Sequence, residues 1–464
     1  MSSAARWSFV NSAFTRVAQL GVGVLLARLI APEQFGAYAA ALVVLNILLS
    51  FSELGVSVAL VRHKGDPADI APTVATLSMA SSGALALLTA LAAPWAAAAM
   101  SAPETTGVLR LMAATLVLAG PSAVPAALLQ RDFRQRRKTT IDLTSFLVGA
   151  GVGVALAAAG FGAWSLAWSR VAGNAVSTIG LLACTPLVRP GWRRDVAGEL
   201  LRFGLPLAGS SLLAFAVMNV DYIVVGNVLG PTQLGFYLLA FNLSSWPVSA
   251  FSQPIRSVSL AAFSTVNDDS QRLRASFSRA LAIVMALTVP ACVLLAALGG
   301  PLVRLVYGRR WAEATSALAV LALLGAVRVA LELAYDLLAS AGRSRAILKI
   351  HLLWLAALGP ALVVGARLDG IRGVAFGHVA VLAVAVVPAY FVALHPHGIT
   401  ARSTVAGLAR PALGALAMAA LALGAQRAVG NDPGRLLLGG AAALAAYTLA
   451  VLPLRRRLAG QPLP

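Results

Sequence analysis

Long apolar segments recur along the whole chain, separated by short connections that hold Gly, Pro and charged residues. A stretch of about 20 apolar residues is long enough to cross the hydrocarbon core of a bilayer as a helix. Short connections fit this pattern, because backbone groups at membrane depth must be satisfied inside helices. We therefore predict an all-α, polytopic membrane protein with fourteen spans, over residues 8–30, 36–61, 72–99, 106–129, 140–160, 162–186, 203–229, 234–263, 277–307, 313–340, 345–367, 370–395, 404–425 and 434–454.

Composition and charge agree with this prediction. Of the 464 residues, 59% are hydrophobic and 11% are charged, whereas roughly a quarter of the residues of a soluble domain are charged. The formal net charge is +19 at pH 7, but the basic residues are spread through short connections, so we expect no nucleic-acid partner. Most of these residues lie in connections on the same side as the two termini, which predicts cytoplasmic termini in a bacterial inner membrane.

The chain offers little of the chemistry that an enzyme needs. Cys184 and Cys292 lie in apolar segments, so we expect neither a metal site nor a disulfide. No Walker A motif is present, so we expect no direct use of ATP and no cofactor. Coupling to an ion or to the membrane potential stays open. A membrane glycosyltransferase or polymerase is a weaker alternative, because the outward connections are short and hold no clustered carboxylates for acid–base work.

Two segments of the chain read alike and indicate an internal repeat. Residues 30–38 (I-A-P-E-Q-F-G-A-Y) and 229–237 (L-G-P-T-Q-L-G-F-Y) share Pro, Gln, Gly and Tyr at one offset, each in the turn between the first and second helix of a six-helix set. Six helices per copy give both copies the same orientation, as in transporters with parallel repeats. We predict an N-terminal lobe, a basic cytoplasmic linker, a C-terminal lobe, and two further helices with a basic tail, over residues 1–188, 189–202, 203–396 and 397–464.

Charged side chains inside the predicted spans are the candidate site. An Arg at the bilayer centre costs about 2.5–3.5 kcal/mol on insertion scales, so such residues face protein or a water-filled cavity. Arg256 has no acid within one turn on its own helix, and a guanidinium binds phosphate oxygens in bidentate fashion. We hypothesise that Arg256 and Arg16 contact an anionic headgroup, with Glu53 and Asp221 beside them. A second set of candidates is Arg170, Asn174, Arg328 and Glu332.

Simple charge pairing is the alternative for several of these residues. Arg16 and Glu53 share a depth of about 12 Å from the cytoplasmic side, at roughly 1.5 Å per residue. Arg328, Glu332 and Asp336 are spaced four residues apart, which puts them on one face of a helix where they can pair. His351 and His378 also lie in apolar spans, and we interpret them as packed, hydrogen-bonded residues rather than proton carriers.

Several motifs together resemble one known family. They are G-F-G-A-W-S-L (160–166), F-G-L-P-L-A-G-S-S-L-L (203–213), D-Y-I-V-V-G-N-V-L-G-P-T-Q-L-G-F-Y (221–237), P-I-R-S-V (254–258) and Y-G-R-R-W (307–311). Over residues 5–395 the chain resembles the polysaccharide biosynthesis proteins, the Wzx-like oligosaccharide flippases of the multidrug/oligosaccharidyl-lipid/polysaccharide (MOP) superfamily. S-L-A-A-F (259–263) departs from the proline-containing helix end of that family, which puts bending of this helix in doubt.

The resemblance implies two six-helix lobes around a cationic cavity lined by helices 1, 2, 7 and 8, which carry Arg16, Glu53, Asp221 and Arg256. It implies translocation of an undecaprenyl-diphosphate-linked oligosaccharide to the periplasmic leaflet for O-antigen, capsule or exopolysaccharide synthesis, without covalent chemistry. Expected partners are this anionic lipid, the membrane lipids, and the polymerase or ligase machinery of glycan assembly. A peptidoglycan-precursor flippase, a multidrug or cation antiporter and a non-transporting scaffold are the remaining alternatives.

Overall fold

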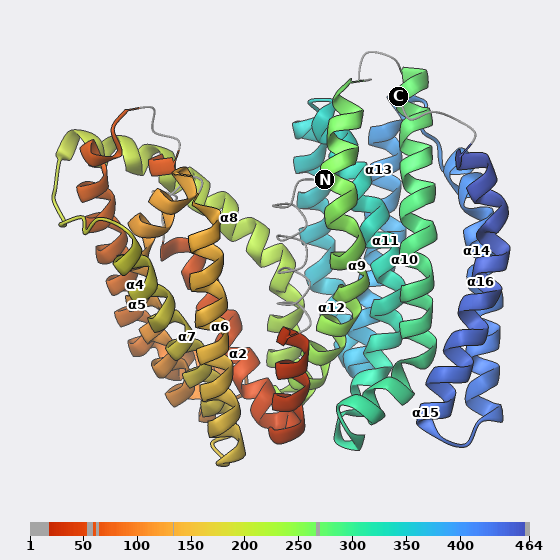
Figure 1. The fold of residues 1–464 in the computed structure, drawn as a ribbon, viewed down its shortest axis with the longest axis horizontal. Helices are drawn as coiled ribbons and strands as arrows, with labels where there is room; N and C mark the ends of the chain where they lie inside the picture. Colours follow the sequence, from red (N-terminus) through yellow and green to blue (C-terminus); the bar gives the residue numbers. More distant parts are fainter. Residues whose placement is uncertain (1–17, 53–58, 62–64, 133, 266–269, 460–464) are drawn as a thin grey trace. The chain divides into compact units, whose positions relative to one another are not determined.

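A computed structural model describes residues 18–52, 59–61, 65–132, 134–265 and 270–459 of the chain. Every regular element in these ranges is a helix. The chain divides into two compact units, Met1–Gly235 and Phe236–Pro464 (Figure 1). The predicted all-α fold is therefore confirmed over the described residues.

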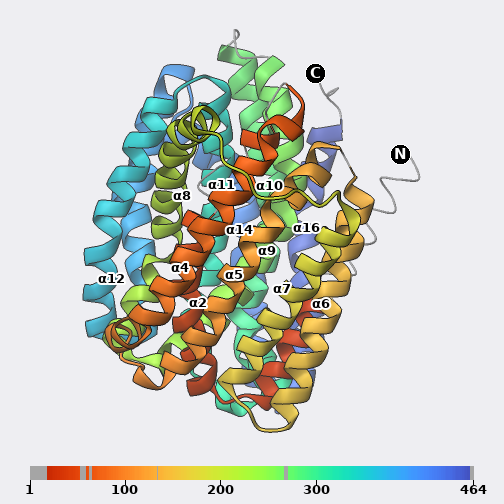
Figure 2. The same ribbon diagram turned by 90° about the vertical axis from the view of Figure 1, so that its left-hand side faces the viewer.

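Over its described residues the first unit contains the shorter helix Ala18–Leu29 and the long helices α2 (Pro32–Ser52), α4 (Ala71–Ala99), α5 (Thr106–Arg131), α6 (Gln135–Ala158), α7 (Ala163–Cys184) and α8 (Arg194–Leu229). Its largest described core joins α2, α4, α5 and α7 through small residues such as Ala41 and Ala167 and larger ones such as Met112 and Leu116. Helices α6 and α7 lie side by side (Figures 1 and 2). They approach so closely at Gly149 that an added Cβ would lie only 2.8 Å from the Ser169 carbonyl oxygen.

The second unit contains most of α9 (Pro231–Thr265) and the helices that follow it. These are α10 (Ser270–Val306), α11 (Ala314–Ser340), α12 (Ser344–Val381), α13 (Val387–Leu394), α14 (Ala401–Ala428), the short α15 (Asp432–Gly434) and α16 (Gly440–Ala459). Helix α12 contains the predicted span 345–367 and the start of the span 370–395, and its backbone leaves helical geometry between them at Asp369 (φ −149°) and Gly370 (φ 55°). A π-helix, Leu382–Val386, joins α12 to α13.

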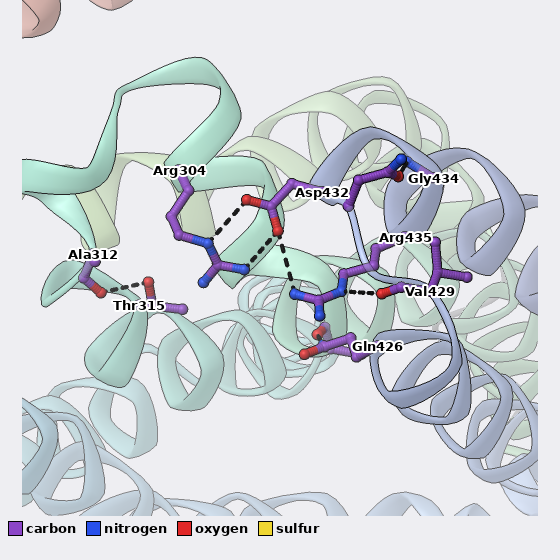
Figure 3. Close-up of polar contacts among 10 residues, drawn as sticks. Arg304, Ala312, Thr315, Gln426, Val429, Asp432, Gly434 and Arg435 are labelled. Carbon is purple, nitrogen blue, oxygen red and sulfur yellow. Dashed lines mark hydrogen bonds and ion pairs between the residues drawn. The ribbon is translucent and has the colours of Figure 1, made fainter.

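The C-terminal helices α14 and α16 pack on α10 as a hairpin. Met418, Ala422, Ala443 and Tyr447 form an apolar core with Val289, Val293 and Leu298 of α10. At one end Asp432 accepts hydrogen bonds from Arg304 Nε at 3.0 Å and Nη2 at 2.8 Å, and Arg435 Nη1 lies 3.4 Å away (Figure 3). The hairpin is therefore fixed by apolar packing along its length and by a charged cluster at its turn.

Each of the fourteen predicted spans overlaps a helix in the described residues. Eight helices there meet a strict test of length and apolar composition for crossing a membrane, and one of them, Ser344–His397, covers two predicted spans. The protein is thus a multi-pass membrane protein. The compact units divide between Gly235 and Phe236, whereas the predicted lobes 1–188 and 203–396 describe the repeat and stay a prediction.

The repeated Pro-x-Gln-x-Gly turns meet each other inside the first unit. A Cβ on Gly36 would overlap the carbonyl oxygen of Pro231, and a Cβ on Gly235 would overlap that of Pro32. The Cβ added to Gly36 would lie 2.9 Å from the amide nitrogen of Gly235, and the Cβ added to Gly235 would lie 3.1 Å from the amide nitrogen of Gly36. The two turns therefore touch reciprocally, backbone on backbone, and only glycine leaves room for that approach.

Candidate functional site

The structure describes some of the predicted site residues and not others. Arg16 and Glu53 lie outside the described residues. Arg256 is on α9, but its side chain is outside the described part. Asp221 is on α8, is 1% exposed, and accepts a hydrogen bond from the Tyr222 amide at 2.9 Å. Assignment of these four residues to a substrate cavity stays a prediction.

Arg170 forms the best-defined polar cluster of the first unit. It is on α7, half-buried, and its Nη2 donates to Asn46 Oδ1 of α2 at 3.3 Å. The Tyr38 hydroxyl of α2 lies near the same guanidinium. Asn174 follows one turn later on α7 and is also half-buried. A cation is thus placed among neutral polar groups.

The guanidinium of Arg170 is not fully satisfied within the protein. Its Nε is buried and has no hydrogen-bond partner among the described residues. A buried unsatisfied donor costs about 1–3 kcal/mol, and more when it is charged. Arg170 follows the first residue of α7, Ala163, by two turns, so it lies about 10 Å along the span at roughly 1.5 Å per residue. An anionic group that reached this place would meet a ready donor.

The second unit carries a different polar cluster on α11. The Arg328 guanidinium lies over the Phe241 ring of α9, with Cζ 5.3 Å from the ring centroid. Such a cation–π contact contributes about 0.5–2 kcal/mol, depending on desolvation. Glu332, one turn further along, has a buried Oε2 with no hydrogen-bond partner in the described part of the chain. The spacing along α11 therefore does not produce an Arg328–Glu332 ion pair here.

An aromatic row lies next to this cluster. The Tyr335 and His351 rings meet edge to face at 5.9 Å, and the Trp354 ring follows at 6.2 Å. His351 Nδ1 lies 2.9 Å from the Ile347 carbonyl oxygen, which holds the imidazole in place. Trp354 Nε1 is buried and has no partner among the described groups. This row combines an edge-to-face pair with a tilted pair of rings, and it holds one buried donor without a partner among the described groups.

Sequence reasoning missed one polar pair. His378 of α12 is 9% exposed, and its Nε2 lies 3.3 Å from the hydroxyl of Tyr237, which is fully buried on α9. Tyr237 is the last residue of the second repeated turn. Its place in the repeat is the sequence feature that could have pointed to this pair. An apolar span around a single His gives no other hint of such a partner.

Comparison with known proteins places the chain in a family. Residues 25–316, more than half of the chain, match the polysaccharide biosynthesis protein family. The chain belongs to this family. The predicted resemblance is thereby confirmed.

Named relatives cover much of this polysaccharide biosynthesis protein. The lipopolysaccharide biosynthesis protein WzxC of Escherichia coli is 25% identical over 406 residues, which cover 85% of this chain and 81% of that protein. The succinoglycan biosynthesis transport protein ExoT of Rhizobium meliloti is 28% identical over 320 residues, covering 68% of this chain and 64% of ExoT. The match thus spans slightly less than two thirds of ExoT.

Solved structures share the fold of this polysaccharide biosynthesis protein. The lipid II flippase MurJ in an inward closed conformation aligns with a TM-score of 0.80 and 13% identity, covering 97% of this chain and 99% of MurJ. An inward-facing multidrug resistance transporter of the MATE family, in the MOP superfamily, aligns with a TM-score of 0.66 and 16% identity, covering 82% and 94%. At these identities the likeness shows the fold alone.

The described side chains form polar clusters that can bind a ligand. No group of three or more His, Cys, Asp or Glu residues suitable for a metal ion occurs in the described ranges of this polysaccharide biosynthesis protein. Its polar clusters instead combine a cation with neutral donors and acceptors in one unit, and a cation, an acid and aromatic rings in the other. Groups of this kind can hold an anionic headgroup and the faces of sugar rings.

Proposed function

We propose that this protein translocates a polyprenyl-diphosphate-linked oligosaccharide from the cytoplasmic to the periplasmic leaflet of a bacterial inner membrane. The family, and relatives named for lipopolysaccharide and succinoglycan biosynthesis, support a role in building polysaccharides. ExoT is named a transport protein, which supports transport rather than covalent chemistry. In this proposal both termini are cytoplasmic, and an ion or the membrane potential drives alternating access.

The observation that carries the anionic part of this proposal is the buried guanidinium of Arg170. Its hydrogen-bond partner Asn46 and its neighbour Tyr38 are neutral, and its Nε has no partner among the described residues. A diphosphate oxygen supplies the charge and the acceptor that this group lacks, through a short charge-assisted hydrogen bond. In the same proposal Arg16 and Arg256 offer further contacts to the diphosphate, and Glu53 and Asp221 serve ion coupling.

Accumulation of substrate in a deletion strain tests the proposal. In the source bacterium, deletion of the gene is expected to leave the lipid-linked glycan on the cytoplasmic leaflet, where it is accessible in inside-out vesicles. Complementation with the natural chain should clear it. Complementation with Arg170→Gln at equal abundance should leave at least about tenfold more, since a lost hydrogen bond to a charged group costs about 1.5–3 kcal/mol.

Arg137→Gln is the matched control, because Arg137 is exposed near the start of α6. It should clear the glycan as the natural chain does. If the deletion strain accumulates no glycan but accumulates peptidoglycan lipid precursor, or only loses resistance to cationic drugs, the oligosaccharide assignment is wrong. Equal clearance by Arg170→Gln would remove Arg170 from the binding site.

A further inference from the structure

Two glycines mark equivalent points in the two units. Gly162, which precedes α7, has φ 54° and ψ −126°, and Gly370, within α12, has φ 55° and ψ −141°. Both angles lie in a region that side chains other than glycine rarely adopt. The helical segment that follows each glycine packs closely on the segment before it. In the first unit Ser169 contacts Gly153, and in the second unit Gly377 contacts Ala361.

A basic residue follows each glycine at the same distance. Arg170 is eight residues after Gly162, and His378 is eight residues after Gly370. Each directly follows the residue that packs against the preceding helix, Ser169 or Gly377. The two basic side chains therefore leave their helices in corresponding directions, about two turns from the glycine.

The same repeated tyrosine contacts each base. Tyr38 and Tyr237 end the two Pro-x-Gln-x-Gly-x-Tyr segments. Tyr38 lies beside the Arg170 guanidinium, and the Tyr237 hydroxyl lies 3.3 Å from His378 Nε2. The fold thus builds one tyrosine–base pair twice, with a guanidinium in the first unit and an imidazole in the second.

The two bases differ in what they can do with a proton. A guanidinium stays charged in proteins. An imidazole exchanges a proton in the physiological range, and the added proton turns both ring nitrogens into donors. When Nε2 carries a proton it donates to the Tyr237 hydroxyl oxygen, and the hydroxyl O–H then donates its hydrogen bond to another acceptor. Protonation of His378 therefore adds a charge and makes both ring nitrogens donors inside the second unit.

Other ionisable groups lie on the neighbouring elements of the second unit. Arg372, near the outer turn of α12, pairs with Asp369 at 3.8 Å, and Arg304 of α10 pairs with Asp432. The charged and titratable groups of α11 and α13 that lie further along the second unit are Arg328, Glu332, Tyr335, Asp336 and Tyr390. Tyr237 of α9 contacts the His378 ring, with its hydroxyl 3.3 Å from Nε2.

We propose that His378, held by Tyr237, is a proton-binding site at the position where the first repeat carries the fixed charge of Arg170. A proton taken up from water moves onto the imidazole and is later returned to water, with no other bond changed. With this proton the second repeat resembles the first, and without it the repeats differ by one charge. A role for this proton in a transport cycle rests on the proposed function, but proton binding at His378 can be tested without any glycan.

The direct test is nitrogen NMR on the full chain in lipid nanodiscs, with ¹⁵N-labelled histidine. His378→Gln identifies the His378 signals by their loss. We expect these signals to move between the neutral and protonated positions when the pH is lowered from 8 to 5. Unchanged His378 signals across this range would overturn the proposal, whatever glycan the protein carries.

Hydrogen exchange tests the structural consequence. After correction for intrinsic exchange, the natural chain should exchange differently at pH 5.5 and pH 8 in α9 and in the half of α12 that follows Gly370. Tyr237→Phe and His378→Arg should lose this difference, with His378→Arg fixed in the low-pH pattern. His351→Gln is the matched control, because His351 lies in the first half of α12 and contacts Tyr335 instead. A difference that survives in His378→Arg would contradict the proposal.

Discussion

The first and second repeats bury a tyrosine against a base at the same place, yet the two bases are buried to different extents. Arg170 is half-buried and draws on both Asn46 and Tyr38, whereas His378 is 9% exposed and contacts Tyr237. A permanent charge is expensive to remove from water, and a neutral imidazole is not. The chemistry of the side chain therefore decides how deeply each repeat can bury an otherwise equivalent position.

The two repeats are alike at their reciprocal turn contact, and breaking this contact gives the largest expected effect. Gly36→Ala places a Cβ onto the Pro231 carbonyl oxygen, so the two backbones must separate. Overpacking of this kind typically costs about 1–3 kcal/mol and occasionally more. We expect a large loss of folded protein in the membrane, measured by fluorescence-detected size exclusion after heating.

Gly235→Ala should act in the same direction, since its Cβ would meet the Pro32 carbonyl oxygen. Gly21→Ala is the control, because a Cβ there meets nothing within 4 Å. If Gly36→Ala and Gly21→Ala melt alike, the turns do not touch as described.

Converting one repeat toward the other sharpens the comparison. Arg170→His gives the first repeat the base of the second, so its charge becomes dependent on pH. Glycan translocation should then approach that of the natural chain at pH 5.5 and fall about tenfold or more at pH 8, the effect of losing about 1.4 kcal/mol or more. Arg170→Lys, which keeps a charge throughout this range, should show no such pH dependence. Equal rates for Arg170→His at both pH values would show that the charge at this position is unimportant.

The hairpin of α14 and α16 belongs to the second unit. Removing the charged cluster at its turn should have the next largest effect. Asp432→Ala leaves Arg304 and Arg435 without their shared carboxylate, at a cost of about 1–3 kcal/mol. Limited proteolysis should therefore cut the hairpin connection faster. Asp369→Ala removes an exposed pair at 3.8 Å and should change little. Equal protection of the hairpin in both variants would mean that apolar packing alone holds it.

The smallest effect lies in the linker between the predicted lobes. A hydrogen bond from Arg193 Nη2 at 2.8 Å lowers the pKa of the exposed Asp195 carboxyl. The resulting stabilisation is present above the ordinary pKa of an aspartate and is lost as the pH falls through the lowered value. Arg193→Gln should return the pKa of Asp195 toward its ordinary range, as measured by carboxyl ¹³C NMR. An unchanged pKa would show that the ion pair does not form in solution.

Periodicity and turn residues predicted most of the fold. Each of the fourteen apolar spans overlaps a helix, because hydrophobic length alone specifies a membrane helix. The repeat at Pro32 and Pro231 was also visible, but its reciprocal contact was not, since sequence does not say which turns meet. Helix spacing suggested pairing of Arg328 with Glu332, whereas the structure places Arg328 over Phe241 from another helix.

The site was less predictable than the fold. Charges inside spans identified Arg170, because a buried cation is rare in any membrane segment. They could not reveal Asn46 and Tyr38 as its neighbours, which depends on the packing of α7 on α2. The correspondence between His378 and Arg170 could not be recognised from the sequence. It is visible in the structure, because Gly162 and Gly370 have similar positive φ angles and precede the two bases by the same number of residues.

Reconstitution tests most directly the claim that Arg170 serves an anionic lipid-linked substrate. Lipid-linked glycan extracted from the deletion strain would be placed with the purified chain in proteoliposomes, and its transfer between leaflets followed by access to an external glycan-cleaving enzyme. We predict transfer by the natural chain, a rate at least about tenfold lower for Arg170→Gln, and no change for Arg137→Gln. Equal transfer by the natural chain and Arg170→Gln, or none by either, would contradict the account.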